Sequence, residues 1–227
     1  MAQMLSNLPL GAKVKFGKFL NADLIWIVAD KNHTGYPANS VTLLAERIIY
    51  EMAFDARESS EGGNTHYGYS NLRQWLNSNA AAGKWYSSQH TADVSPASSE
   101  VVDGVTYSTW AGFLNGFSDK ERGAILPTTL SYEEDDSYLS CVDNVFLIGS
   151  NEVGISLSMP NQVKLSLFNI DTDTRKAGYT IAYRILKPSY AADTIGKYWL
   201  RDNSGSTAKN LFEQSGVASS GRPDSAR

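Results

Sequence analysis

The sequence has little cysteine, no long apolar run and no large excess of one charge, and each absence excludes a class of protein. Its 227 residues include one cysteine, Cys141, so neither an internal disulfide nor a multi-cysteine metal site can form. No run approaches the ~20 apolar residues of a membrane helix. Residues 1–11 lack the charged start and apolar stretch of a secretory signal. We therefore expect a protein with no membrane association that folds in a reducing cytoplasm.

The charge and composition are those of a globular protein that does not bind nucleic acid. The formal net charge is −4, and the 20 lysines and arginines are scattered rather than grouped. Nucleic-acid binding requires a cationic surface that neutralises phosphates, so we expect no nucleic-acid partner. Hydrophobic residues make up 42% of the chain and charged residues 19%, which argues against disorder.

Several apolar segments have the pattern of β-strands. Residues 13–17 alternate between polar and apolar side chains, whereas residues 24–29 form an apolar run that ends in a polar turn. The short gap between them favours an antiparallel pair. Residues 41–44 are predicted to add a third strand, and further strands are expected at residues 145–148 and 198–201.

Two segments have the signature of short helices. Ser70 is a good N-cap for residues 70–77, in which the apolar side chains fall at i, i+3 and i+4 on one face. Ser118 and Glu121 have the spacing of a capping box, which predicts a helix over residues 118–126. Helices packed on a mainly antiparallel sheet make this an α+β protein.

The remaining segments are predicted to be mainly loops in one domain. Residues 58–67 are polar and contain glycine, and residues 89–105 are rich in serine and alanine. Residues 46–52 have no periodicity that decides between a helix and an irregular segment. Residues 202–227 predict a loop without a terminal hydrophobic strand. A single domain over residues 1–227, lacking a closing strand, is the simplest organisation.

The apolar residues of these elements are expected to form the core. Arg73 and Arg201 lie within such elements, so we expect them to be framework residues paired with carboxylates or backbone carbonyls. The predicted core consists of Trp26, Leu72, Trp75, Leu76, Phe113, Phe117, Phe146, Leu147 and Trp199.

Aromatic residues make up 11% of the chain, and several of them lie in loop-like stretches. Exposed aromatic rings can stack on sugar rings or on a protein partner, and loops on a rigid scaffold are where recognition normally occurs. The alternative is that these rings cover the core beneath long loops. The candidate binding residues of this loop face are Trp85, Tyr86, Tyr107, Trp110, Tyr132, Tyr138, Asp202, Asn203 and Arg222.

The residue types needed for catalysis lack the usual arrangement. The three histidines, His33, His66 and His90, lie in turn-like or loop-like stretches, and none is close in sequence to Cys141. We therefore expect surface histidines and a structural cysteine that behaves as a small apolar residue. No phosphate-binding loop, dinucleotide fingerprint or zinc spacing occurs, so we expect no cofactor.

One acidic run is a weak candidate for a calcium site. Glu133, Glu134, Asp135 and Asp136 supply the oxygen ligands that Ca²⁺ prefers. They are consecutive, however, and an EF-hand loop requires alternating spacing. A solvated charge run is the interpretation that we favour.

Three motifs occur in a fixed order along the chain. Residues 69–77 read YSNLRQWLN, residues 143–148 read DNVFLI with Glu152 shortly after, and residues 198–201 read YWLR. Together they resemble an uncharacterised domain family of gut and clostridial-type bacteria and their phages. Its members carry an S-x-L-R-x-W-L-N helix, a D-x-V-F-L strand followed by a glutamate, and a Y-W-L-R segment.

The resemblance covers nearly the whole chain and implies a fold. Residues 8–14, 30–37 and 112–118 are also similar to phage-borne members. Family members look similar to C-type-lectin-like domains, in which a twisted, mainly antiparallel sheet and two short helices hold a face of long loops. The family closes with a G-V-R-P-A strand that is missing here, and Asp202-Asn203 stands where members usually have Ser-Pro.

The resemblance also implies a setting, because phage-borne copies are often carried among tail and virion genes. We expect a non-enzymatic virion protein of the tail or capsid, assembled in the host cytoplasm, that binds a host surface polymer or neighbouring virion proteins. We expect it to be a homo-oligomer or part of a symmetric assembly. Two alternatives stay open. One is a purely structural decoration or cementing protein, and the other is an enzyme acting on cell-wall glycan with carboxylates from residues 133–136 and Glu152.

Overall fold

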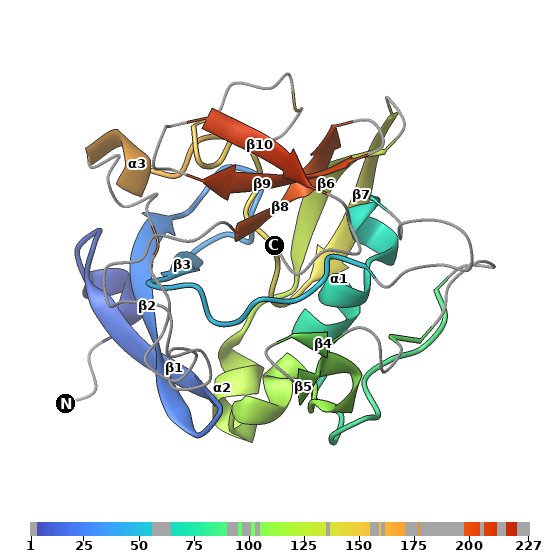
Figure 1. Ribbon diagram of the computed structural model, residues 1–227. Coiled ribbons are helices and arrows are strands. Elements are labelled where there is room, and N and C mark those ends of the chain that lie inside the picture. The colour runs from blue at the N-terminus through green and yellow to red at the C-terminus, as the bar shows by residue number, and fades with distance from the viewer. Residues whose placement is uncertain are drawn as a thin grey trace.

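The fold combines small antiparallel sheets with a few short helices (Figure 1). This mixed α+β architecture agrees with the fold class that the sequence predicts. The computed structural model describes residues 4–55, 65–89, 95–96, 101–102, 105–134, 137–154, 159, 162–170, 177, 198–204, 207–212 and 217–221.

The N-terminal sheet has the order β1-β2-β3, with all neighbours antiparallel. It consists of β1 (Lys13–Phe19), β2 (Ala22–Lys31) and β3 (Val41–Ala45), as the alternation of side chains predicts. Leu20 and Asn21 join β1 to β2 with φ values of 51° and 62°. Two consecutive positive φ values are those of a type I′ turn, whose twist matches that of a hairpin.

A second antiparallel sheet, of order β10-β9-β8, forms near the end of the chain. It consists of β8 (Tyr198–Ser204), β9 (Thr207–Phe212) and β10 (Val217–Gly221). The strand at residues 198–201 is confirmed, but the prediction of a loop after it is wrong over β9 and β10. Antiparallel neighbours joined by short connections satisfy one another's backbone groups, so small and polar residues form strands here without an apolar pattern.

Two hairpins form the rest of the β-structure in the described part of the chain. In the first, β6 (Thr128–Glu134) pairs with β7 (Ser137–Asp143), and β6 lies beside β8 (Figure 1). The second is short and pairs β4 (Val101–Val102) with β5 (Val105–Thr106). Glu133 and Glu134 of the acidic run therefore lie at the end of β6, whereas Asp135 and Asp136 lie outside the described residues.

Both predicted helices are present, with the expected caps. Helix α1 (Asn71–Leu76) begins after Ser70, whose side chain accepts a hydrogen bond from a backbone N–H of the first turn. Helix α2 (Asp119–Ala124) begins with the complete capping box of Ser118 and Glu121. The other helical segments are α3 (Leu167–Ile170) and the 3₁₀ turns η1 (Leu5–Asn7), η2 (Tyr67–Tyr69), η3 (Tyr107–Thr109) and η4 (Phe113–Gly116). In the part of the chain that the structure describes, no helix is long and apolar enough to cross a membrane.

Residues 46–52, for which the sequence left a helix and an irregular segment open, form no helix. One segment differs from the sequence-based expectation. Residues 145–148 were expected to be a buried strand, but they pair with no other strand. Residues 145–147 are half-buried, and Ile148 is buried. Side chains hold this segment instead, since Asn77 Oδ1 accepts the N–H of Val145 at 3.2 Å and Arg201 Nη1 donates to the carbonyl of Leu147 at 2.8 Å.

The core has two main parts. The larger part contains most of the predicted core, with Trp26, Phe146 and Leu147 half-buried against it rather than inside it. At its centre the Trp75 ring lies edge-on to Phe19, with centroids 5.7 Å apart. The smaller part lies beneath the end of β2 and β8 and consists of Ala29, Ile148, Val153, Leu165, Leu167, Phe168 and Leu200. Both parts support the polar cluster described next.

Candidate functional site

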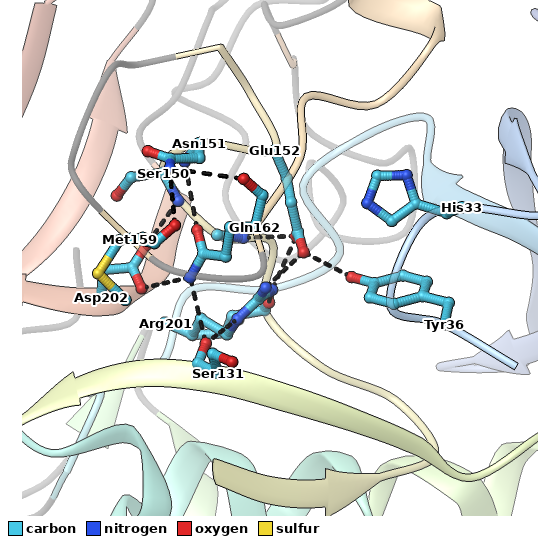
Figure 2. Close-up of polar contacts among 12 residues, drawn as sticks. His33, Tyr36, Ser131, Ser150, Asn151, Glu152, Met159, Gln162, Arg201 and Asp202 are labelled. Atoms are coloured by element: carbon cyan, nitrogen blue, oxygen red, sulfur yellow. Dashed lines mark hydrogen bonds and ion pairs between the residues drawn. The ribbon is translucent and has the colours of Figure 1, made fainter. Parts of the chain in front are cut away.

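A buried ion pair between Arg201 and Glu152 is the centre of a polar cluster (Figure 2). Each side chain is only 1% exposed. Arg201 Nη1 donates to Glu152 Oε2 at 2.8 Å, and Nη2 donates to the other carboxylate oxygen. Arg201 Nε also donates to the carbonyl of Ser131 on β6 at 2.9 Å. Tyr36 Oη donates to Glu152 Oε1 at 2.7 Å, and the N–H of Gly149 donates to Glu152 Oε2 at 2.9 Å.

The electrostatics of this pair keep it ionised. Burial alone raises the pKa of Glu152, but Arg201 and the hydrogen bonds to the carboxylate outweigh burial and hold that pKa below its usual value. Burial and the neighbouring Glu152 charge raise the pKa of Tyr36 well above its ordinary value. Glu152 is therefore ionised and Tyr36 protonated near neutral pH, and the Glu152–Arg201 pair links the turn after residue 149 to β8.

Asp202 anchors a second part of the cluster next to the ion pair. Its carboxylate accepts the backbone N–H of Ser150 at 2.6 Å and Gln162 Nε2 at 2.8 Å (Figure 2). Gln162 Nε2 also donates to the carbonyl of Ser131 at 3.1 Å, and its Oε1 accepts from the N–H of Asn151 at 3.3 Å. These bonds fix the turn after residue 149 against β6 and β8.

A histidine–aspartate pair lies on the other side of Tyr36. His33 Nδ1 is 2.7 Å from Asp30 Oδ2, and the same carboxylate accepts Ser166 Oγ at 2.8 Å. Burial raises the pKa of Asp30, but the hydrogen bonds from His33 and Ser166 lower it further than burial raises it. The prediction of a surface histidine is wrong for His33, which is 4% exposed. The turn after β2 folds the ring back, edge-on to Tyr36 at 4.6 Å.

A separate cluster joins α1 to β7. Arg73 Nε donates to Asp143 Oδ1 at 2.9 Å, and Arg73 Nη1 donates to the carbonyl of Gly68 at 2.7 Å. Tyr67 Oη donates to Asp143 Oδ2 at 3.0 Å. The prediction that Arg73 and Arg201 are framework residues paired with carboxylates is thus confirmed.

Cys141 lies beside this second cluster. Its Sγ is 3.5 Å from Asp143 Oδ2. Burial and the Asp143 carboxylate raise the pKa of the thiol to about 12. The nucleophilic form is the thiolate, so Cys141 is held in its unreactive form near neutral pH.

The structure buries several residues of the predicted loop face. The expectation of exposure is wrong for Trp85, Tyr107, Tyr132 and Asp202, since the three rings cover the larger core and Asp202 belongs to the buried polar cluster. Tyr86 and Trp110 are half-buried, and Tyr138 is 50% exposed. The side chains of Asn203 and Arg222 lie outside the described residues.

The candidate calcium ligands are only partly described. Glu133 is half-buried on β6, opposite Tyr138 of β7. The side chains of Glu134, Asp135 and Asp136 lie outside the described residues, as does His90. Among the side chains that are described, no three metal-ligating residues come together.

A partly open pocket of about 220 Å³ lies next to the polar cluster. Tyr36 and Glu152 form part of its wall, and most of the remaining wall is apolar. The pocket extends along β3 and residues 46–52 on one side and residues 145–148 on the other. The ion pair thus holds one wall of the pocket in place.

Sequence reasoning missed most partners in these clusters. Asp30 and His33 are three residues apart. This spacing of an acid and a histidine at the end of a strand could have predicted that the two side chains pair. Gln162 and Ser166 lie in a stretch without periodicity. Gln162 is 40 residues before its partner Asp202, and Ser166 is 136 residues after its partner Asp30. Their roles depend on chain-distant contacts, which one sequence does not reveal.

Comparison with known protein families matches residues 39–225 to the family described as "Domain of unknown function (DUF6273)". Neither the curated proteins nor the solved structures gave a match.

Proposed function

We propose that this chain, which belongs to the DUF6273 family, is a non-enzymatic binding protein of a phage particle. In this proposal the domain has a C-type-lectin-like arrangement and is part of the tail or capsid. It binds a host surface polymer through an exposed face. The phage setting and the lectin-like arrangement come from the sequence motifs, and the choice of face comes from the structure.

The observation that carries the proposal is the exposed outer side of β7. Tyr138 and Val142 are 50% and 58% exposed, although both are large hydrophobic residues, and Leu139 on the opposite face of the strand is 38% exposed. Tyr138 and Val142 are four positions apart, so they share one face of the strand. Exposed apolar residues gathered on one element are typical of an interaction site.

The buried clusters support a binding role in a second way. Asp143 ends β7 and is held by Arg73, while the carbonyl of Ser131 on β6 accepts from Arg201. Both strands of the hairpin are therefore fixed to the core by charged side chains. A rigid scaffold lowers the entropic cost of binding, because fewer groups have to be ordered on contact.

The test is a pull-down of the tagged protein with host cell-wall fractions and, separately, with virions that lack it. We expect saturable binding to the wall fraction that Tyr138→Ala weakens by about tenfold, the effect of losing an aromatic hot spot. Tyr69→Ala is the matched control, because Tyr69 is 37% exposed but lies in η2. Wall binding that is equal in both variants would remove β7 from the proposal, and no wall binding would reject the receptor-binding role.

A purely structural decoration protein is the second candidate. Among the described strands β7 pairs only with β6, and a strand edge that makes no ladder with another strand of its own chain can pair with a neighbouring subunit. Binding to virions but not to wall fractions, with sensitivity to Tyr138→Ala, would favour this role. Homo-oligomerisation measured by sedimentation would then locate the interface at β7.

The glycan-acting enzyme is the role that we do not propose. Two carboxylates facing a cleft are needed, and Glu152 is bonded to Arg201 and Tyr36 in a buried cluster. Glu133 lies on β6, opposite Tyr138. A zymogram with host cell wall that shows lysis by the purified protein would overturn the non-enzymatic proposal.

A further inference from the structure

The pocket beside the ion pair has predominantly aromatic and aliphatic walls. β2 and β3 contribute Trp26 and Leu44, and Ile48 follows in the next segment. Phe146 and Tyr198 close it from the other side. Residues from both core clusters thus line one space, although they come from distant parts of the chain.

The polar atoms of the indole rings in this wall already have partners inside the protein. Trp26 Nε1 donates to the carbonyl of Phe16 at 2.7 Å, and Trp75 Nε1 donates to that of Ala111 at 2.9 Å. Trp199 Nε1 donates to the carbonyl of Met52, also at 2.9 Å. These rings can therefore offer a ligand their carbon surface but not a hydrogen bond.

The charge at the Glu152 end of the pocket is likewise neutralised, and the other two charged residues of the described wall, Arg47 and Glu51, carry opposite signs. Glu152 is paired with Arg201 and accepts the Tyr36 hydroxyl, so this end of the pocket offers no uncompensated charge. A charged ligand would lose its hydration without gaining a partner here. A sugar would leave most of its hydroxyls unsatisfied for the same reason.

The volume limits the size of the ligand. A dry apolar cavity of roughly 150 Å³ holds one benzene molecule. At about 220 Å³ this pocket is larger and suits one or two fused rings. Aromatic side chains prefer edge-to-face or offset contact with another ring, which favours a planar ligand over a branched chain.

We propose that this pocket binds a small, uncharged, planar aromatic molecule of one or two fused rings. The ligand lies against Trp26 and Phe146 and makes mainly van der Waals contacts. This inference does not rest on the proposed surface-binding role, because it concerns a different part of the molecule and a different class of ligand.

Titration with indole, followed by ¹⁵N-labelled NMR spectra of the full chain, tests the proposal. We expect saturable shifts of the Trp26 and Trp75 indole signals. Indole-3-carboxylate, which has the same rings and a negative charge, should bind at least tenfold more weakly. Equal affinity for the two probes would overturn the proposal of an uncharged ligand, because it would mean that a cation of the wall, such as Arg47, compensates the carboxylate.

A filling variant locates the site. Leu44→Trp fills part of the pocket and should weaken indole binding at least tenfold. Leu126→Trp is the matched control, because Leu126 is 47% exposed and lies at the surface after α2, and its affinity for indole should equal that of the wild type. If Leu44→Trp does not fold, Ala45→Leu replaces it as a smaller filling change in the same wall.

Two further results would overturn the proposal. If indole produces no saturable shift up to its solubility limit, the pocket is filled by the protein itself in solution. If indole binds the filling variant as tightly as the wild type, the probe binds elsewhere.

Discussion

Replacing Glu152 by glutamine removes one charge from a pair in which both partners are buried. Arg201 would remain ionised without its counter-charge, and breaking a buried pair in this way typically costs about 3–5 kcal/mol. We expect the free energy of unfolding of Glu152→Gln, measured by urea denaturation at pH 7, to fall by about that amount. Asp119→Asn is the control, because the Asp119 side chain is 98% exposed in its pair with Arg122 and an exposed pair contributes little.

The same residue predicts how stability depends on pH. The pKa of Glu152 is lowered in the folded protein from its ordinary value of 4.5, so the folded state holds the proton less tightly than the unfolded chain. The stabilisation is therefore present above the unfolded pKa and is lost as pH falls through the folded pKa. Below about pH 5 the wild type should lose stability more steeply than Glu152→Gln. Parallel curves of stability against pH for the two proteins would contradict this expectation.

Cys141 should react slowly with thiol reagents. Its pKa of about 12 leaves a very small thiolate fraction at pH 8. We expect modification by iodoacetamide to be on the order of a hundredfold slower in the folded protein than in urea, where the thiol regains an ordinary pKa. Equal rates in the two conditions would show that burial and Asp143 do not suppress ionisation.

At the level of elements, Gly17 joins β1 to η4 and α2. Gly17 has a φ of +69°, and a Cβ at this position would overlap the ring of Phe117. Its N–H donates to Glu121 Oε1 at 2.8 Å. Gly17 lies where the register of β1 with β2 shifts, so this irregular part of the strand is hydrogen-bonded to the glutamate of the α2 capping box.

Alanine substitutions separate the two constraints on Gly17. Gly11→Ala is the matched control, because Gly11 has a φ of +81° but nothing within 4 Å of an added Cβ. Gly11→Ala should cost about 1–2 kcal/mol from the left-handed backbone alone. Gly17→Ala should cost about 1–3 kcal/mol more, because it also overpacks the core. Equal losses in thermal melts of the two variants would mean that the Phe117 ring moves away freely.

Local signals explain which elements could be predicted from the sequence. Ser70 and the capping box of Ser118 and Glu121 act within a few residues, and both helices begin where they predict. The alternation in β1 and the apolar run of β2 are local as well. These features depend on backbone groups close in the chain, so one sequence is enough to find them.

The parts that were missed depend on distant contacts. Residues 145–148 have the composition of a strand, but Asn77 and Arg201 take their backbone groups, and neither partner is near in sequence. Tyr107 and Tyr132 look like loop aromatics, yet both are buried because surrounding segments fold over them. Of the candidate site, the framework role of the two arginines was predictable from their place in apolar elements, whereas the identities of their partners were not.

At the scale of the whole molecule, the polar cluster joins segments that are far apart in the chain. Tyr36 and Glu152 are 116 residues apart, and Asp30 and Ser166 are 136 apart (Figure 2 shows the first pair). Arg201 adds contacts with β6 through Ser131. Because each of these links closes a long loop, the cluster forms only when the N-terminal sheet, the β6–β7 hairpin and β8 are all in place.

This interdependence predicts that the protein unfolds as one unit. Asp143→Asn breaks the α1–β7 cluster and Glu152→Gln breaks the other, so the two variants loosen different regions. If the regions are coupled, each variant should shift the whole urea transition to lower concentration without changing its slope. Far-UV circular dichroism and tryptophan fluorescence should then give the same midpoint in each variant, as a two-state transition requires. An early phase seen by one signal alone would mean that the two clusters stabilise separate folding units. The rigid scaffold proposed for β7 would then consist only of the β6–β7 hairpin and α1.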